Sequence, residues 1–371
     1  MRIAMIGHKR IPGREGGVEV VVEELATRLA AKGHSVDVYN RHKKELILPK
    51  AYKGVRLIDV PTIEKKSTDA VVYAFLASIL VLFKRYDVIH YHAIGPSFFL
   101  FIPHLFGKKT VVTVHGLNYK TPKWKGFGEK FMKWGEHVTA KYADEVIVLS
   151  KEQQKYFKNK YNRETVYIPN GTTVNDIIEP ELIRDKYGLE KNSYILFVSR
   201  VVPGKGIEYL LDAYKEVDSD LKLIIAGEST YVGEFYTKIK EKAARDKRVE
   251  LIGFVEGKTL QELYSNCALF VFPSEAEGMP MCLLEALSYN CNCLVSDIPE
   301  NIEVGKQYVT TFESQNTEDL KDKIVQALGN RKADGSRDYI IENFNWDAVV
   351  DKTLDCYRRQ YGYSYNYYAN I

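Results

Sequence analysis

The sequence predicts an α/β protein with two doubly wound domains, each a parallel sheet covered by helices on both faces. Short apolar runs typical of buried strands alternate with helical segments from the N-terminus onward, an order that favours parallel strands. The same alternation restarts after residue 193. The chain has 371 residues, and a domain usually spans about 100–200 residues, so two domains are expected.

The first half contains seven expected strands. Its first helix, Val18–Lys32, has apolar residues on one face and ends at Gly33. The apolar run Ala70–Phe83 is shorter than the ~20 residues of a membrane-spanning helix, so we expect a buried or surface-docked helix. The expected strands are Arg2–Gly7, Ser35–Asn40, Val55–Val60, Val88–His92, Thr110–His115, Glu145–Leu149 and Val166–Ile168.

The second half repeats the pattern. Asn170-Gly171 and Glu179-Pro180 interrupt regular structure between the halves. We expect domains at 1–175 and 176–345, and a terminal helix and tail at 346–371 that crosses back to the first domain. Two such domains form a cleft, and ligands of these sheets bind beyond the carboxyl ends of the strands. The expected elements are strands Tyr194–Ser199, Leu221–Gly227, Val249–Ile252, Ala268–Pro273 and Asn292–Ser296, and helices Gly206–Tyr214, Leu260–Ser265 and Met281–Ser288.

Charge is unevenly distributed along the chain. Residues 1–170 contain 29 Lys and Arg against 16 Asp and Glu, whereas the rest contains 23 against 33. Either the basic half meets an anionic lipid, a membrane surface or nucleic acid, or the two halves attract each other across the cleft. The five cysteines lack zinc-site spacing and no signal peptide precedes them, which indicates free thiols in a reducing, cytoplasmic compartment.

Two loops carry features suited to phosphate. Gly16 and Gly17 immediately precede a helix, where backbone N–H groups approach an anion closely; the alternative is a flexible turn. Arg200 and Lys205 flank a Pro-Gly turn after the first strand of the second domain. Two fixed cations on one loop suit a diphosphate, and the alternative is an ordinary solvated turn.

A third segment, Pro273–Ala286, carries two carboxylates. Glu277 lies in a loop after a strand and Glu285 lies about one turn into the following helix, so both are able to face the same cleft. Carboxylates accept hydrogen bonds from sugar and ribose hydroxyls, and the helix N–H groups near Met279 and Met281 suit phosphate or sugar oxygens. Taken singly, either glutamate is equally compatible with capping or exposure.

These segments resemble glycosyltransferase family 4. E-G-M-P-M-C-L-L-E-A, preceded by F-V-F-P-S, resembles the family's two-glutamate motif. G-R-E-G-G-V-E, V-T-V-H-G, I-P-N-G, V-S-R-V-V-P-G-K-G and G-F-V resemble further motifs of the family, in its order. The resemblance implies the GT-B fold and a retaining, bacterial polysaccharide-type transferase. It also implies a UDP-, GDP- or dTDP-linked hexose or deoxyhexose donor and a glycan or lipid-diphosphate acceptor. The N-terminal loop is also similar to a subset of which some members transfer rhamnose.

The resemblance also implies residue roles. Gly16 and Gly17 approach the donor phosphate, Arg200 and Lys205 neutralise the leaving diphosphate, His115 lies beside the reacting centre, and Glu277 holds sugar hydroxyls. The family's usual H-D is His115-Gly116 here, which removes an acid or base role for a following Asp. The remaining donor contacts are Glu285 to the ribose, Phe254 and Val255 near the base, Glu228 in a cleft loop, and the stretch of Gly278, Met279, Pro280 and Met281 beside the sugar.

No metal and no cofactor are expected, since two cations already supply positive charge for the leaving group. Asp218-Ser219-Asp220 spells D-x-D but lies in a turn before a strand, where a solvated loop is expected. His90 and His92 lack further zinc ligands at suitable spacing, so we expect histidines of the core or cleft lining.

The stretch 117–137 interleaves basic and aromatic residues. It suits a lipid-diphosphate acceptor or contact with the inner membrane surface, and the alternative is an amphipathic helix packed on its own domain. Other functions are a nucleotide-sugar epimerase of similar fold or a non-catalytic nucleotide-sugar-binding protein. No RRM, helix-turn-helix or zinc pattern supports nucleic-acid binding. The basic and aromatic residues are Lys120, Lys123, Trp124, Lys125, Phe127, Lys130, Phe131, Lys133 and Trp134.

Overall fold

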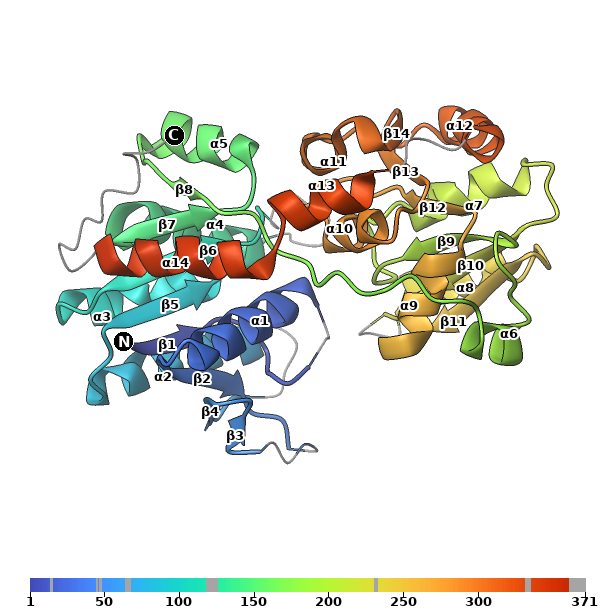
Figure 1. Ribbon diagram of the computed structural model, residues 1–371. Helices are drawn as coiled ribbons and strands as arrows, with labels where there is room; N and C mark the ends of the chain where they lie inside the picture. Colours follow the sequence, from blue (N-terminus) through green and yellow to red (C-terminus); the bar gives the residue numbers. More distant parts are fainter. Residues whose placement is uncertain are drawn as a thin grey trace, which may run out of the picture. The chain divides into compact units, whose positions relative to one another are not determined.

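The computed structural model describes residues 1–13, 16–44, 46, 49–63, 68–117, 126–229, 233–330 and 335–359. The chain divides into two units (Figure 1). The first holds the described residues up to Gly171 and from Trp346 onward, and the second holds Thr172–Asn345. At the start of the second unit, Thr172 pairs with Asn345, the last residue of that unit, and donates its N–H to the carbonyl of Phe344 at 2.8 Å.

The first unit is built on an eight-stranded sheet in the order β3-β4-β2-β1-β5-β6-β7-β8. Every neighbouring pair is parallel except β3 and β4, which form an antiparallel edge that the sequence did not predict. The strands are β1 (Arg2–Ile6), β2 (Ser35–Arg41), β3 (Ala51–Tyr52), β4 (Val55–Val60), β5 (Val88–His92), β6 (Thr110–Val114), β7 (Glu145–Val148) and β8 (Val166–Tyr167).

Helices cover both faces of this sheet (Figure 1). One face buries Tyr91 and Val112 against Tyr73 of α2 and Met132 of α4. On the other face α14 lies beside α1, tied by Arg28–Asp347 at 3.0 Å and Lys32–Asp351 at 2.8 Å. The helical elements are α1 (Gly17–Ala31), α2 (Asp69–Leu80), η1 (Val81–Phe83), η2 (Pro96–Leu100), α3 (Phe101–Leu105), α4 (Phe127–Tyr142), α5 (Lys151–Tyr161) and α14 (Trp346–Arg359).

The second unit is a six-stranded, fully parallel sheet in the order β11-β10-β9-β12-β13-β14. Its core packs Phe197, Ile225 and Val271 against Leu210 of α7 and Leu320 of α12. The strands are β9 (Tyr194–Val198), β10 (Lys222–Ala226), β11 (Val249–Gly253), β12 (Leu269–Phe272), β13 (Cys293–Ser296) and β14 (Val309–Phe312). The helical elements are α6 (Leu182–Tyr187), α7 (Ile207–Lys215), α8 (Glu234–Ala243), α9 (Gly257–Asn266), α10 (Met281–Ser288), α11 (Pro299–Gly305), η4 (Lys306–Tyr308), α12 (Thr317–Gly329) and α13 (Ser336–Asn343).

The predicted fold class is confirmed, because both units are doubly wound α/β sheets. In each sheet the strand order reverses once near the middle, between β1 and β5 in the first unit and between β9 and β12 in the second. We call these two places the first and the second switch point. Loops that follow strands at such a point diverge and leave room for a ligand.

Candidate functional site

At the second switch point, backbone hydrogen bonds join four loops into a continuous rim. The N–H of Gly227 donates to the carbonyl of Gly253 at 2.8 Å, which links the ends of β10 and β11. The N–H of Val201 donates to Glu228 at 3.3 Å, and that of Glu275 donates to Gly204 at 3.0 Å. The loops after β11, β10, β9 and β12 therefore lie in one row. This row contains the predicted donor-binding residues of the second unit other than Met281 and Glu285, which lie on α10 (Met281–Ser288).

Two glycines allow this row to close. Gly206 has a φ of +72°, and a Cβ there would lie 1.9 Å from the carbonyl oxygen of Pro273. Gly227 has a φ of +150°, and its Cβ would lie 1.8 Å from the carbonyl oxygen of Ser199. Any side chain at either position would push neighbouring loops apart, so close packing of the loops depends on glycine.

Lys205 and Glu277 form the centre of the rim. The Nζ of Lys205 donates to Oε1 of Glu277, and Ser274 Oγ donates to the same oxygen at 2.5 Å. The two charged side chains are 17% and 11% exposed, respectively. Charge interactions in such a sheltered place are stronger than on an open surface. Lys205, the residue predicted to bind the diphosphate, thus contacts Glu277, the residue predicted to bind the sugar, directly across the switch point.

Exposed side chains flank this pair. Arg200 is exposed and forms no ion pair with any residue that the structure describes. Phe254, after β11, is 53% exposed, and Glu228, after β10, is also exposed. Val255 is partly buried. The rim therefore offers a solvent-facing cation, a carboxylate and an aromatic face beside the sheltered pair.

Helix α10 adds the second glutamate. Glu285 Oε2 accepts a hydrogen bond from Tyr264 Oη at 3.0 Å. The pKa of the Cys282 thiol is raised to about 12, first by burial and next by the Glu285 carboxylate, while Lys205 opposes the rise. The Glu277 carboxylate also raises this pKa. Lys205 and Glu277 are thus in direct contact, and Glu285 lies eight residues after Glu277 on α10, the helix that begins at Met281.

The first residues of α10 and the loop before it determine which backbone N–H groups are available to a donor molecule. Pro280 is the N-cap, and its side chain makes no capping hydrogen bond. Proline has no N–H, so within the predicted stretch only Gly278, Met279 and Met281 have backbone donors. Pro280 therefore contributes no backbone donor to this stretch, and it is the N-cap of the helix whose positive end lies at this loop.

At the first switch point, the loop after β1 is held by Glu19. Gly16 is the extended N-cap of α1, and no side chain caps that helix. The carboxylate of Glu19 accepts from the N–H of Lys9 at 3.0 Å, and a Cβ on Gly16 would lie 2.9 Å from Glu19 Oε2. Gly17 is the first residue of α1. The sequence did not single out Glu19, although it belongs to the quoted glycine motif; Arg14 and Glu15 lie outside the described residues.

His115 directly follows β6, at the carboxyl ends of the strands of the first sheet. Its Nε2 lies 3.0 Å from Nδ1 of His92, the last residue of β5. Burial lowers the pKa of His115 to about 4. This histidine is therefore uncharged near neutral pH, and it offers a neutral hydrogen-bonding group rather than a cation. The sequence predicted His115 as a site residue but gave no sign of its bond to His92.

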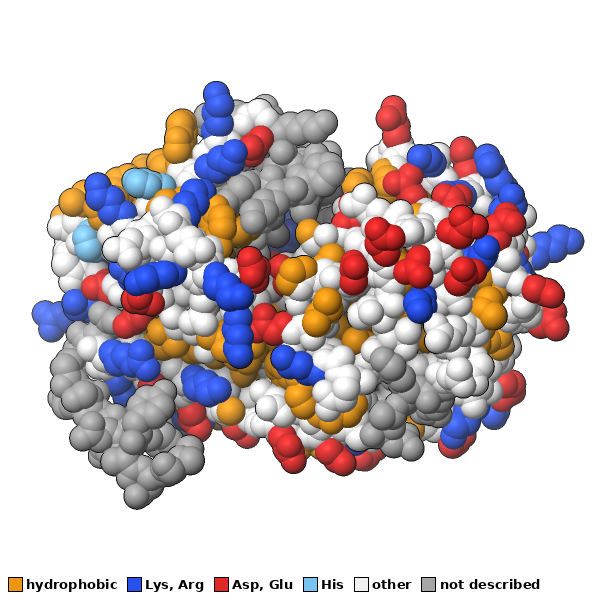
Figure 2. Space-filling view, turned by 90° about the horizontal axis from the view of Figure 1, so that it is seen from above, with side chains coloured by type: hydrophobic (Ala, Val, Ile, Leu, Met, Phe, Trp, Pro, Cys, Tyr) orange, Lys and Arg blue, Asp and Glu red, His pale blue; other side chains and the backbone are white. Residues whose placement is uncertain are grey.

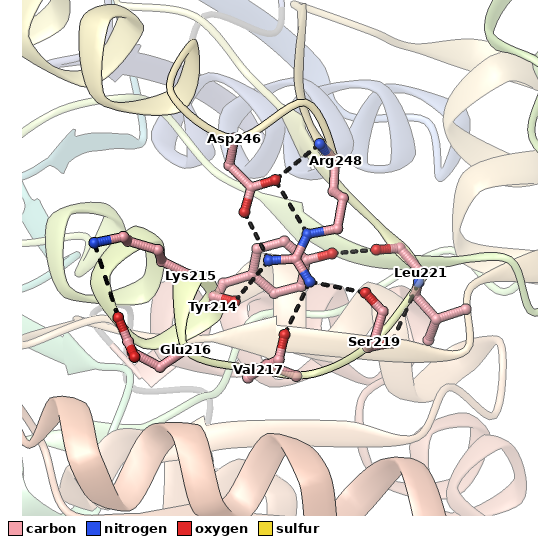
Figure 3. A network of polar contacts seen from close by, with 8 residues as sticks. All are labelled: Tyr214, Lys215, Glu216, Val217, Ser219, Leu221, Asp246 and Arg248. Atoms are coloured by element: carbon pink, nitrogen blue, oxygen red, sulfur yellow. Dashed lines mark hydrogen bonds and ion pairs between the residues drawn. The ribbon is translucent and has the colours of Figure 1, made fainter.

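Histidines 90 and 92 are fully buried, as expected for core or cleft-lining residues. The described residues contain no group of three His, Cys, Asp or Glu side chains that could hold a metal ion. The Asp218–Asp220 turn is organised by Arg248, whose Nη1 donates to the carbonyls of Val217 and Ser219, both at 2.8 Å (Figure 3). The guanidinium of Arg248 therefore binds carbonyl oxygens within and next to the D-x-D turn.

The basic-aromatic stretch is partly described. Lys120, Lys123, Trp124 and Lys125 lie outside the described residues, as does the side chain of Phe127. The rest belongs to α4, which packs on its own unit through Met132 and Val138. Its outer aromatic residues meet η2, with the rings of Phe98 and Phe131 5.2 Å apart. The described part of the stretch is therefore a helix packed on its own unit, as the alternative interpretation had it, and Trp134 remains 51% exposed on this helix.

Comparisons with known proteins identify the family of the chain. A family model described as Glycosyltransferase Family 4 matches residues 15–176, and one described as Glycosyl transferases group 1 matches residues 180–345. The UDP-Gal:alpha-D-GlcNAc-diphosphoundecaprenol alpha-1,3-galactosyltransferase of Escherichia coli is 27% identical over 327 residues, which cover 82% of this chain and 84% of that protein.

Two solved structures are similar over nearly their whole length. Sucrose-phosphate synthase from Thermosynechococcus elongatus has a TM-score of 0.81 at 19% identity, covering 98% of this chain and 100% of that one. Anabaena HepE in complex with UDP-glucose has a TM-score of 0.75 at 15% identity, covering 96% and 99%. At these identities the likeness concerns the fold.

Proposed function

The chain belongs to glycosyltransferase family 4 and has the GT-B fold, and we propose that it moves a sugar from a nucleotide-diphosphate donor, with retention of anomeric configuration. Its acceptor in this proposal is a lipid-diphosphate-linked glycan of cell-surface polysaccharide synthesis. The observation that carries the proposal is the rim of the second switch point, where Lys205, Glu277 and Glu285 gather beside the start of α10. This combination suits the three parts of a donor: diphosphate, sugar and ribose.

The donor-binding roles follow from the charge pattern. Lys205 and the exposed Arg200 hold the diphosphate and stabilise the charge that grows on it as the sugar leaves. Glu277 accepts hydrogen bonds from sugar hydroxyls, and Glu285 accepts them from the ribose. Phe254, Val255 and Glu228 lie on the same rim and contact the base side of the nucleotide. Gly16 and Gly17 bring the start of α1 to the phosphate or sugar.

The proposed reaction takes place on one face of the sugar. The bond between the anomeric carbon and the β-phosphate oxygen breaks, and the acceptor hydroxyl forms its new bond to that carbon from the same side. The hydroxyl proton passes to the departing phosphate oxygen, so no protein base is required. Because two side chains already supply positive charge, we propose that turnover needs no metal. His115 contributes a neutral hydrogen bond near the reacting centre.

The relative from Escherichia coli suggests a particular donor and acceptor class. Its printed activity uses UDP-galactose and a sugar carried on diphosphoundecaprenol. We extend that class to this chain: a uridine diphosphate donor, and an acceptor with a diphosphate and a long isoprenoid tail. A dTDP-linked deoxyhexose such as rhamnose is the second donor to test, because the N-terminal loop resembles that subset.

A surface of the first unit suits such a lipid acceptor. Phe83 is 81% exposed, Leu105 is 75% exposed and Phe106 is 69% exposed, and Trp134 on α4 is 51% exposed. An apolar cavity of about 290 Å³ lies between α3 and α4, lined by Phe98, Phe101, His104, Leu105, Val138 and Tyr142.

Blue lysine and arginine side chains predominate on the left of Figure 2, where the first unit lies, and red acidic ones on the right. Exposed aromatic residues among cations favour contact with an anionic membrane surface. None of the described helices combines the length and apolar character that a bilayer crossing requires.

The donor test begins with thermal unfolding in the presence of UDP-, GDP- and dTDP-linked sugars. A ligand that binds only the folded state raises the melting temperature, so the true donor should stand out. Transfer to a synthetic diphosphate lipid is then followed, and proton NMR of the product reports whether the anomeric configuration is retained. Activity in excess chelator tests the absence of a metal requirement.

The outcomes separate this proposal from its alternatives. Donor conversion without any acceptor would indicate an epimerase, and binding without transfer to any acceptor would indicate a sensor. An inverted product, or activity that is lost in chelator and restored by Mg²⁺, would contradict the proposed chemistry. Flotation with anionic and with neutral liposomes, comparing wild type with Phe106→Asp, tests the membrane contact; no binding to anionic vesicles would exclude it.

A further inference from the structure

Three imidazole rings lie in contact at the first switch point. Side chains two residues apart on a strand share a face, so His90 and His92 both project from the same side of β5. Their ring centroids are 4.2 Å apart, with planes inclined at 34°. His92 in turn contacts His115, whose ring centroid is 5.3 Å away. The ring of His92 thus lies between the ring of His90 and the ring of His115, the proposed site residue.

The far end of this row is fixed by hydroxyl groups. Nδ1 of His90 lies 2.7 Å from Tyr357 Oη, and Nε2 lies 2.7 Å from Thr113 Oγ1. Tyr357 is fully buried and belongs to α14, the helix that follows the second unit in sequence and packs on the first. Both nitrogens of His90 are therefore hydrogen-bonded, which leaves its ring little freedom to rotate, and His92 packs against a rigid surface.

All three rings are neutral at physiological pH. Burial lowers the pKa of His90 to about 3 and that of His115 to about 4, and it lowers the pKa of His92 well below 6.5. Each neutral imidazole carries one proton, so the bond between His92 Nδ1 and His115 Nε2 contains one proton. Either His92 donates to His115, or His115 donates to His92.

The second nitrogen of His92 decides between these arrangements. Nε2 of His92 is buried and has no hydrogen-bond partner among the described residues. If His115 were the donor, His92 would have to carry its own proton on Nε2, and a buried N–H group would lack an acceptor. Orphaned buried N–H groups are rarer than under-satisfied acceptors. The favoured arrangement therefore has the His92 proton on Nδ1, donated to His115.

We propose that His92 is a positioning residue that holds His115 in the tautomer with its proton on Nδ1, and that His90 and Tyr357 fix His92 for this task. The proposal deepens the proposed function, on which it rests for the role of His115 beside the donor sugar. Because Nε2 of His115 accepts the hydrogen bond from His92, the uncharged ring of His115 carries its proton on Nδ1. This N–H group is available to donate a hydrogen bond. A hydroxyl oxygen of the donor or acceptor would be its partner.

The tautomer is measured directly by long-range proton–nitrogen NMR on protein labelled with ¹⁵N-histidine, without any sugar present. Signals are assigned with His115→Asn and His92→Asn. The proposal expects a protonated Nδ1 and a bare Nε2 for His115, the opposite of the tautomer that free histidine prefers in water. In His92→Phe, which keeps a ring but removes the hydrogen bond, His115 should shift toward the Nε2 proton. A wild-type His115 protonated on Nε2, or no change in His92→Phe, would overturn the proposal.

Kinetic measurements then distinguish a positioning role of His92 from a role in stability alone. His92→Phe should lower kcat on the order of 10-fold to 100-fold, as loss of an orienting partner does, while the donor KM stays within about twofold. His92→Asn places an amide near the former Nδ1 and should recover part of kcat. Equal losses in both variants, or unchanged kcat in folded His92→Phe, would contradict the proposal. If His115→Asn itself retains full kcat, the proposed role of His115 fails, while the NMR result still tests the tautomer.

Discussion

The two switch points have the same topology and differ in their side chains. The first contains buried, neutral imidazoles, and all eight histidines of the chain lie within residues 1–137. The second contains no histidine; its side chains are Lys205, Glu277 and Glu285, with Arg200 beside them. The same strand reversal therefore supplies a place for a ligand twice: the second has a charged pair of Lys205 and Glu277, whereas the first has a row of uncharged imidazoles, with the Glu19 carboxylate holding the loop after β1. In our account, the second point binds the nucleotide diphosphate and the imidazoles of the first point act on the sugar during transfer.

The largest expected effect concerns the cations of the second switch point. Lys205→Ala and Arg200→Ala should each lower kcat on the order of 10²- to 10³-fold, because each removes a group that stabilises the leaving diphosphate. Steady-state transfer assays on folded protein measure this. Lys215→Ala is the matched control, since that lysine is 75% exposed on α7. Wild-type turnover in Arg200→Ala would remove Arg200 from the mechanism.

The glycines that close each switch point come next. Gly7→Ala places a Cβ 2.2 Å from the carbonyl oxygen of His92, and Gly227→Ala places one 1.8 Å from that of Ser199. Each should destabilise its unit by about 3 kcal/mol or more, since unfavourable backbone dihedrals alone cost about 1–3 kcal/mol. Urea unfolding followed by circular dichroism reports the loss. Gly233→Ala, whose Cβ meets no atom of the described residues within 4 Å, should be near neutral. Comparable losses in all three variants would show that the close approaches do not matter.

Acid should weaken the first switch point selectively. Burial lowers the pKa of His8 and of His115 to about 4, below the value of about 6.5 in the unfolded chain. Between these values the unfolded state binds more protons, so stability is full above pH 6.5 and falls as the pH drops toward 4. Each such histidine contributes a loss of about 1.4 kcal/mol per pH unit in this window.

Hydrogen exchange of the whole chain at pH 7 and pH 5, corrected for intrinsic rates, locates this effect. Peptides from β1, β5 and β6 should lose protection at pH 5, whereas peptides from β9 and β12 should change little. Equal loss in both units would contradict the assignment of acid sensitivity to the buried histidines.

The smallest effect concerns the support of Glu285. Tyr264→Phe removes the hydrogen bond from Tyr264 Oη to Glu285 and should weaken donor binding by about 1 kcal/mol, or roughly fivefold in Kd. Tyr289→Phe is the control, because that ring stacks on Tyr264 while its hydroxyl contacts Asn175 instead. Calorimetric titration with the donor nucleotide distinguishes the two. An equal loss in both variants would attribute the effect to packing.

Much of the fold could be predicted because the central strands are continuous apolar runs bounded by glycine and polar turns. Strand β14, Val-Thr-Thr-Phe, was missed because two threonines interrupt its short apolar pattern. The antiparallel β3 has only two residues, too few for any periodicity. Local pattern therefore sufficed for the central strands and for the edge strands β8 and β11, and it failed for the edge strands β3 and β14, where pairing with a neighbour determines the strand.

The candidate site divides in the same way. Arg200, Lys205, Glu277 and Glu285 were predicted because they occupy loops and a helix start directly after strands. Ser274 lies three residues before Glu277 in the same loop, within the quoted F-V-F-P-S segment, but the sequence did not single it out as a partner. Tyr264 gave no signal because its contact with Glu285 joins two different helices, α9 and α10. His92 is the clearest case: its spacing suggested a core residue, and only the register of β5 beside β6 brings it to His115.

The central claim is that nucleotide binding belongs to the second switch point and not to the first. Calorimetric titration of UDP, or of the nucleotide selected by the thermal-shift panel, against Arg200→Ala and His115→Asn tests it most directly. We predict that Arg200→Ala weakens Kd by at least about tenfold, since a charge-assisted hydrogen bond is lost, while His115→Asn stays within about twofold of wild type despite a lower kcat. A His115→Asn protein that loses nucleotide affinity as much as Arg200→Ala would contradict the account.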